Sequence, residues 1–229
     1  MVKIPRPTEL RPDAILFEDN HCLAVSKPPR LLVAADRTGD PNLLDLAREY
    51  IRRKYQKPGN VFLGLVHRLD RPVSGIVLFA RTSKAAARLS EQFRERRVEK
   101  VYRALVPASG ASPSGTLKDW LLKDTATNTV RCVPAHTPEA KPAVLHYRRV
   151  RAGREWAEVE IHLETGRSHQ IRVQLAAHGM PICGDRKYGS AVALPGAIAL
   201  HASKLNFEHP TRREPITITA PPPAFWSQL

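Results

Sequence analysis

The sequence holds little cysteine: three residues in 229, at positions 22, 132 and 183. Three widely separated cysteines provide neither a disulfide framework nor a closely spaced pair of zinc ligands. Long apolar runs are also missing, because no stretch of about 18 apolar residues occurs and the N-terminal segment has no apolar core of signal-peptide length. We therefore expect a protein of the reducing cytoplasm that is neither exported nor inserted in a membrane.

Several enzyme signatures are absent as well. A kinase catalytic loop places His-Arg-Asp in succession, whereas leucine separates Arg68 from Asp70 here, and neither a glycine-rich phosphate loop nor Asp-Phe-Gly occurs. The His-Leu-Glu at 162–164 resembles half of a zinc deaminase signature, but Cys183 has no paired cysteine. The nine histidines otherwise show no ligand spacing. We expect no metal, nucleotide or redox cofactor.

Positive charge is in excess. Lysine and arginine number 36 against 22 aspartates and glutamates, which gives a net charge of +14. Such a charge indicates a polyanionic partner, with nucleic acid ahead of an anionic membrane, although a soluble, highly charged surface is the alternative. The 42% of hydrophobic residues is enough for a packed core in a chain of this length.

Hydrophobic periodicity predicts a mixture of short strands and helices. Helical spacing occurs at 43–51, 83–97 and 168–178, and the last of these ends at Gly179, with Pro181 beyond it. Strands are expected at 15–17, 22–25, 98–106, 117–122, 129–133, 144–150, 156–163, 197–207 and 215–219. The first two helices carry many arginines and lysines, which makes their outer faces candidate RNA contacts, although a solvated face is the commoner meaning of such a run.

Residues 61–82 hold the candidate chemistry. The polar tetrad His67-Arg68-Leu69-Asp70 lies between two apolar runs, 61–66 and 76–80, and Pro72 and Gly75 interrupt the segment. Each run is short for a helix, so the pattern predicts two buried strands joined by a loop. A rigid frame around a polar loop suits a catalytic site, although surface loops carry the same residue types.

The tetrad and the Ser74-Gly75 that follows it resemble the signature loop of the RluA family of RNA pseudouridine synthases. Two further segments resemble that family in the same order: Lys100–Ala104, and Thr165–Val173 with Gly184-Asp185 after it. Lys27-Pro28 near the start, and Leu200-His201-Ala202 and Phe207–Pro210 near the end, extend the resemblance to about residues 14–224. The chain departs from the family at Pro29 and Arg30, where a small residue and a glycine are usual, and at Val73, where threonine is usual.

The resemblance implies an α+β fold with a long, bent, mostly antiparallel mixed sheet, peripheral helices and a central basic RNA cleft. It implies one catalytic domain over residues 14–224, preceded by an N-terminal extension at 1–13 and by no separate RNA-binding domain. The implied reaction converts specific uridines of ribosomal or transfer RNA into pseudouridine. We expect a monomer that needs no obligatory protein partner and no cofactor. A non-catalytic RNA-binding or RNA-folding protein on the same scaffold is the alternative.

The resemblance also assigns roles to individual residues. Asp70 is the implied nucleophile, because a carboxylate can add covalently to the sugar or to the uracil ring and leave again. Arg172 is its implied salt-bridge partner, since a carboxylate in a dry pocket stays ionised only beside a cation. Tyr102 is the second implied catalytic residue: it is expected to line the pocket, where its ring can stack on uracil or its hydroxyl can help remove the C5 proton. Arg68 is expected to occupy the place of the flipped base. His67 is expected beside Arg68 on the substrate-binding side of the loop, as part of its scaffold.

Overall fold

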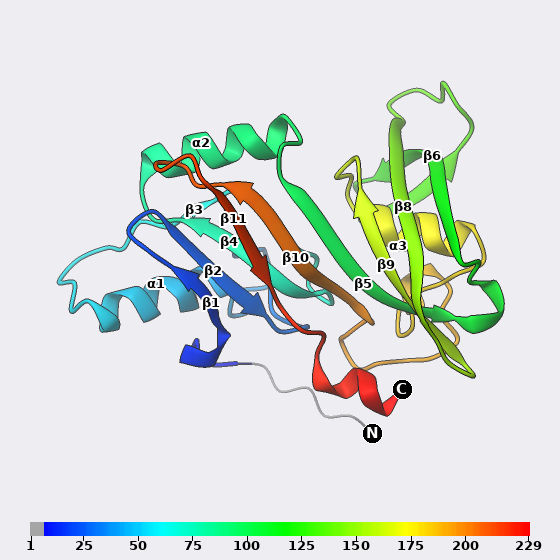
Figure 1. Ribbon diagram of the computed structural model, residues 1–229, viewed down its shortest axis with the longest axis horizontal. Coiled ribbons are helices and arrows are strands. Elements are labelled where there is room, and N and C mark those ends of the chain that lie inside the picture. Colours follow the sequence, from blue (N-terminus) through cyan, green and yellow to red (C-terminus); the bar gives the residue numbers. More distant parts are fainter. Residues whose placement is uncertain (1–6) are drawn as a thin grey trace. The chain divides into compact units, whose positions relative to one another are not determined.

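The computed structural model describes residues 7–229, apart from the side chain of Gln228, and the chain divides into two compact units (Figure 1). The first unit comprises the described residues up to Glu99 together with Ala202–Pro223, and the second comprises Lys100–His201 with Ala224–Leu229. Each unit has its own strands, helices and buried apolar cluster.

The first unit is built from short strands and two α-helices. Its strands are β1 (Ile15–Glu18), β2 (Cys22–Lys27), β3 (Gly64–Leu65), β4 (Ser74–Ala80), β10 (Leu200–Glu208) and β11 (Pro215–Thr219). Its helices are η1 (Pro12–Ala14), α1 (Leu43–Lys54) and α2 (Ser83–Arg94). The strand order is β1-β2-β4-β10, with β3 on β4 and β11 on β10.

Strand β4 lies at the centre of this unit, and all of its residues are buried. Helix α2 packs Ala85 and Leu89 into the same core, and it begins after Thr82, whose hydroxyl accepts the Ala85 N–H. The turn between β10 and β11 lies against α2 (Figure 1), where the Gln92 side chain bonds both the N–H and the carbonyl oxygen of Glu208. These contacts pack β4 into the core of the unit.

The second unit is an antiparallel sheet with one α-helix. Its strands are β5 (Glu99–Pro107), β6 (Ser114–Asp124), β7 (Thr129–Val133), β8 (Lys141–Ala152) and β9 (Trp156–Leu163), in the order β5-β9-β8-β6-β7. Its helices are α3 (Gln170–Ala177) and the short η2 (Ala108–Gly110), η3 (Arg186–Tyr188) and η4 (Ala224–Gln228). Val173 of α3 packs on Leu121, Val130 and Ala143, so α3 covers one face of the sheet (Figure 1).

The α+β class and the mostly antiparallel pairing predicted from the sequence are confirmed. The expected strand at 61–66 is wrong in extent: only Gly64–Leu65 pair with β4, and Phe62 is 53% exposed. The predicted helix 168–178 begins later, at Gln170, because His169 has a left-handed backbone conformation that no α-helix continues. None of the helices in residues 7–229 is long and apolar enough to cross a membrane.

Candidate active site

The loop between β3 and β4 carries three of the sequence-predicted site residues. Asp70 is half-buried, and its carbonyl oxygen accepts the Val73 N–H at 3.0 Å, which closes a tight turn. Leu69 points into the protein and is 7% exposed. Arg68 is exposed and makes no hydrogen bond or ion pair with the described residues. The loop therefore carries a carboxylate and an exposed guanidinium two positions apart in the sequence.

His67 is tied to the frame of this loop. Its Nε2 accepts the backbone N–H of Leu78 at 2.9 Å, and its ring stacks on Phe93 of α2 with 4.7 Å between centroids. A ring nitrogen that accepts a hydrogen bond carries no proton, so this contact favours neutral His67 with its proton on Nδ1. The side chain satisfies a β4 N–H beyond the end of β3, which explains why that strand stops after two residues. These contacts fit the scaffold role.

Lys27 also contacts the loop that carries Asp70. Its side chain is almost fully buried, and its Nζ donates to the carbonyl oxygens of Pro28, Leu31 and Arg71 at 3.0, 2.8 and 3.2 Å. Burial lowers the pKa of Lys27 to about 7, and the nearby Asp70 charge opposes that shift. Because Arg71 follows Asp70 directly, the ammonium fixes the main chain next to the candidate nucleophile.

Tyr102 and Arg172 belong to the second unit. Tyr102 lies opposite Ile161 on the neighbouring strand β9, and directly opposed residues of an antiparallel pair point to the same face. Through β8 and β6 that face continues to Ala143 and Leu121, on which α3 packs. Tyr102 and the helix that carries Arg172 therefore lie on one face of the sheet.

Arg172 is buried and paired with Asp185. Its Nε and one terminal nitrogen donate to the two carboxylate oxygens at 2.7 and 2.9 Å, and the two side chains are 6% and 2% exposed. The guanidinium also lies over the Tyr188 ring, 5.0 Å from its centroid. The bidentate pair engages the Nε edge of the guanidinium and fixes the plane of the group.

The start of α3 is fixed by a side chain that folds back on the sheet. Gln170 accepts hydrogen bonds from the Thr165 hydroxyl and the Arg167 N–H, and it donates to the carbonyl oxygen of Val144. At the other end, Gly179 has a φ of +75°, and the Met180 N–H bonds back to the Leu175 carbonyl. The helix therefore ends where the glycine signal predicted, and its position on the sheet is set.

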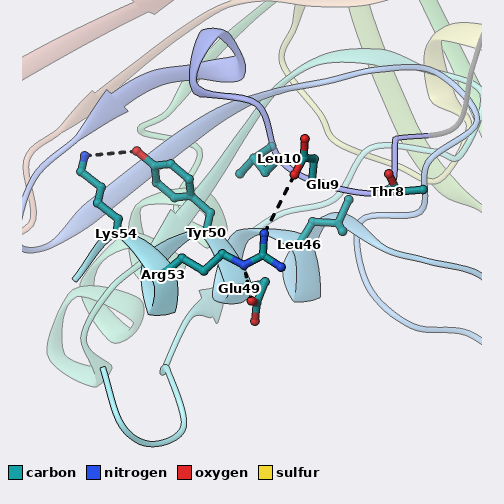
Figure 2. A pocket seen from close by; sticks show the side chains of 8 residues that line it. All are labelled: Thr8, Glu9, Leu10, Leu46, Glu49, Tyr50, Arg53 and Lys54. Carbon is teal, nitrogen blue, oxygen red and sulfur yellow. Dashed lines mark hydrogen bonds and ion pairs between the residues drawn. The ribbon is translucent and has the colours of Figure 1, made fainter. Parts of the chain in front are cut away.

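The basic residues of α1 pair with acidic residues in the same unit. The pairs are Arg48 with Asp45, Arg52 and Arg53 with Glu49, and Lys54 with Glu18. Figure 2 shows Arg53 reaching toward both Glu49 and Glu9, in a pocket of about 360 Å³ between the helix and residues 8–10. Because nearby carboxylates offset these cations, the expectation that this helix face contacts RNA loses much of its support.

Asp19, Cys22 and His209 bring atoms of metal-ligand type within 4.8 Å of one another. His209 uses both ring nitrogens inside the protein: Nε2 bonds Asp19 at 2.8 Å and Nδ1 accepts the Arg212 N–H at 2.9 Å. Burial raises the pKa of the Cys22 thiol to about 12, which disfavours the thiolate that binds metals. This cluster joins the β1–β2 turn to the β10–β11 turn as a structural contact.

The five sequence-predicted site residues thus form two groups. His67, Arg68 and Asp70 share the loop before β4, and Tyr102 and Arg172 share a sheet face of the second unit. The expected ion pair between Asp70 and Arg172 would join the two units and stays a prediction.

Sequence reasoning gave no role to Lys27, Asp185 or Tyr188. One signal was available for Lys27, because a lysine that ends an apolar strand must bury its ammonium or bend it to solvent. Asp185 was part of a motif, but its partner is 13 positions away along the chain. Nothing in the spacing shows that Tyr188 meets His169 and β7.

The chain is similar to known proteins over most of its length. It matches the family described as RNA pseudouridylate synthase over residues 21–177. An uncharacterized RNA pseudouridine synthase of Bacillus subtilis is 36% identical over 218 residues, which cover 94% of this chain and 70% of the relative. The ribosomal large subunit pseudouridine synthase D of Xylella fastidiosa is 35% identical over 229 residues, which cover 94% of this chain and 67% of the relative. Among solved structures, human RNA pseudouridylate synthase domain containing 4 has a similar fold, with a TM-score of 0.77 at 23% identity, covering 94% of this chain and 90% of that one.

Proposed function

The chain belongs to the RluA family of RNA pseudouridine synthases and is an isomerase that acts on RNA, and on this basis we propose that Asp70 is its catalytic nucleophile. The observation that carries the proposal is the family match over residues 21–177, which contains the Asp70 loop, Tyr102 and Arg172. The presence of all three argues against a non-catalytic RNA-binding protein on the same scaffold.

The reaction breaks the bond between uracil N1 and the sugar C1′, turns the base, and joins C5 to C1′. The Asp70 carboxylate adds either to C1′, with uracil leaving as an anion, or to the uracil ring, and it departs again when the carbon–carbon bond has formed. The hydrogen on C5 is lost as a proton, and a proton is taken up at N1. Substrate and product therefore have the same composition, and the step needs no redox partner.

Arg172 is proposed to keep Asp70 ionised, and Tyr102 to stack on the target base. Two observations within the second unit support these roles: the Arg172 guanidinium is buried and held in one plane by Asp185, and Tyr102 lies on the sheet face that α3 covers. Arg68 is proposed to occupy the place that the flipped base leaves. Its exposed side chain, with no partner in the described residues, is available for that role.

We propose the large-subunit ribosomal RNA as the target, because the similar protein of Xylella fastidiosa is named for that RNA. The chain spans 67% of that relative's length. A cytoplasmic location and a monomeric state are proposed from the sequence, and the three free thiols agree with a reducing compartment.

The test follows the hydrogen that the isomerisation must release. Ribosomal RNA transcribed with tritium at uridine C5 is incubated with the wild type and with Asp70→Asn, in the presence of chelator. The wild type should release one tritium per pseudouridine formed. Asp70→Asn should release none while its RNA dissociation constant stays within about threefold, because the variant keeps the size of the side chain and loses the nucleophile.

Turnover by Asp70→Asn would remove the nucleophile assignment. Absence of release by the wild type on RNA lacking pseudouridine would favour the non-catalytic alternative. Arg68→Ala provides a separate measurement with a fluorescent base analogue beside the target. We expect slower turnover and weaker base flipping, with nearly unchanged RNA affinity. Normal flipping and normal turnover would mean that Arg68 has only a scaffold role.

A further inference from the structure

The Arg172 guanidinium is held on two sides within the second unit. The Asp185 carboxylate bonds its Nε edge, at 2.7 and 2.9 Å, and the Tyr188 ring lies 5.0 Å from its central carbon. Arginine has a long, flexible side chain, and ordering it costs conformational entropy at each rotatable bond. A carboxylate at one edge and an aromatic ring beside the charged group together leave the guanidinium one orientation.

Tyr188 is itself fixed by two neighbours. Its hydroxyl oxygen accepts the backbone N–H of Val130 at 3.0 Å, and it lies 2.6 Å from Nδ1 of His169. The rings of Tyr188 and His169 meet edge to face, with 5.7 Å between centroids. One hydroxyl thus joins three segments: η3, strand β7 and the residue before α3.

The contacts of Tyr188 include a residue with a backbone conformation that is uncommon outside glycine. His169 has a φ of 51° and a ψ of 16°, the left-handed region that side chains other than glycine rarely adopt. This conformation ends the preceding loop directly before α3, and the His169 ring contacts Tyr188. Strained residues persist where the surrounding contacts determine them, and such residues gather at functional sites.

The neighbouring Lys187 strengthens the same connection. Its Nζ donates to the carbonyl oxygen of Asn128 at 2.7 Å, in the turn between β6 and β7. Together with the Val130 contact, this bond ties η3 to the β6–β7 hairpin. Tyr188 is therefore held by the sheet and the loop before α3, while its ring contacts the cation of that helix.

We propose that Tyr188 is a positioning residue for the isomerisation: it holds the Arg172 guanidinium in the orientation that serves the Asp70 carboxylate. The inference rests on the proposed function, because it takes Arg172 as the partner of Asp70. Tyr188 acts through Arg172 and makes no contact with the reacting atoms. A cation held in place before the reaction stabilises developing charge with little reorganisation, so loss of Tyr188 lowers the rate of the chemical step and leaves RNA binding in place.

Two substitutions separate the ring from the hydroxyl. Tyr188→Phe keeps the ring beside Arg172 and removes the bonds to Val130 and His169, whereas Tyr188→Leu removes the ring as well. Tyr147→Phe is the matched control, because Tyr147 is a buried tyrosine of the same unit, whereas the ring beneath the Arg172 guanidinium is that of Tyr188. The measurement is tritium release from C5-labelled ribosomal RNA in a single turnover with excess enzyme, alongside the RNA dissociation constant.

The rate constant should fall about tenfold in Tyr188→Phe and about a hundredfold in Tyr188→Leu, the scale expected when a catalytic group is displaced by an ångström. The dissociation constant and the amplitude of release should match the wild type in both variants. Tyr147→Phe should match the wild type in all three quantities. A merely structural role would lower the folded fraction of the enzyme, measured by circular dichroism, and leave the rate constant at saturating folded enzyme unchanged.

Three results overturn the proposal. They are a wild-type rate constant in Tyr188→Leu, a fall in the folded fraction alone, and a dissociation constant that rises as much as the rate falls. Each of these, with an active wild type and an inactive Asp70→Asn, leaves the proposed function intact. If the wild type itself released no tritium, the proposed function would fail and the role of Tyr188 with it.

Discussion

A Cβ atom on Gly75 would lie 2.3 Å from the carbonyl oxygen of Ala202 and 2.4 Å from its nitrogen. Gly75 also has a φ of +119°, which L side chains rarely adopt. Both residues belong to the first unit, where β4 and β10 are neighbours. The missing side chain therefore sets how closely the two strands approach at the point where the Asp70 loop enters β4.

Gly75→Ala should lower the free energy of unfolding by about 3 kcal/mol or more, since it adds backbone strain and an overlap with main-chain atoms that cannot turn aside. Urea unfolding measures the change. Gly59→Ala is the matched control, because no atom lies within 4 Å of the position its Cβ would take, and it should stay within about 0.5 kcal/mol of the wild type. Equal stability of the two variants would mean that the strands can separate freely at Gly75.

His67→Phe should keep the stacking on Phe93 and leave the Leu78 N–H without its acceptor, at a cost of about 1–3 kcal/mol in the free energy of unfolding. RNA affinity should stay within about twofold, because the scaffold role places His67 away from phosphates. His67→Gln, whose amide oxygen can replace Nε2, should recover part of the lost stability. A large loss of RNA affinity at unchanged stability would instead make His67 a substrate contact.

Lys27 should make stability depend on pH above neutrality. Burial lowers the pKa of Lys27 in the folded protein to about 7, whereas a lysine in the unfolded chain has a pKa of about 10.4. Between these values the unfolded chain binds a proton that the folded chain has released, so the free energy of unfolding rises with pH by at most about 1.4 kcal/mol per pH unit. Below about pH 7 both states bind the proton, and this contribution is constant.

Lys27→Met should therefore flatten the rise in stability between about pH 7 and 9, measured as urea midpoints at matched ionic strength. Lys57→Met, at an exposed position in the same unit, should keep the wild-type slope. If the slopes of all three proteins agreed, the three carbonyl acceptors around Nζ would be holding Lys27 protonated throughout that range.

Much of the fold could be predicted from hydrophobic spacing. The opening hairpin, α1, the start of α2, strands β7, β9 and β11, and the end of α3 lie where the sequence places them. The pattern failed at 61–66, because β-branched residues resemble a strand even where a histidine side chain takes the place of a strand carbonyl. The pattern also predicted only 117–122 for β6, which extends from Ser114 to Asp124. The added residues include glycine, lysine and aspartate, which are poor strand formers, and pairing with the neighbouring strands β8 and β7 extends the strand through them.

The candidate site rests on local motifs. The loop with Asp70, the tyrosine of β5 and the arginine of α3 were predicted as site residues because each stands in a recognisable segment. Contacts between distant positions were not, since a lysine bound to carbonyl oxygens or a tyrosine bound to a backbone N–H leaves no residue pattern in the partner segment. The residue type at position 30 was equally uninformative about the backbone. Arg30 stands where the family usually has glycine, and it still has a positive φ of 70°, which glycine favours.

The hydrogen bonds from Lys27 to the loop limit which residues of this protein can be substituted. The ammonium binds main-chain oxygens, which every amino acid possesses, so this contact sets no requirement on the side chains of residues 28, 31 and 71. Only Lys27 is indispensable to the contact, whereas Leu31 is constrained separately because its side chain is buried. Random mutagenesis with selection for a folded chain should therefore recover several residue types at positions 28 and 71, apolar residues at 31, and almost none in place of Lys27.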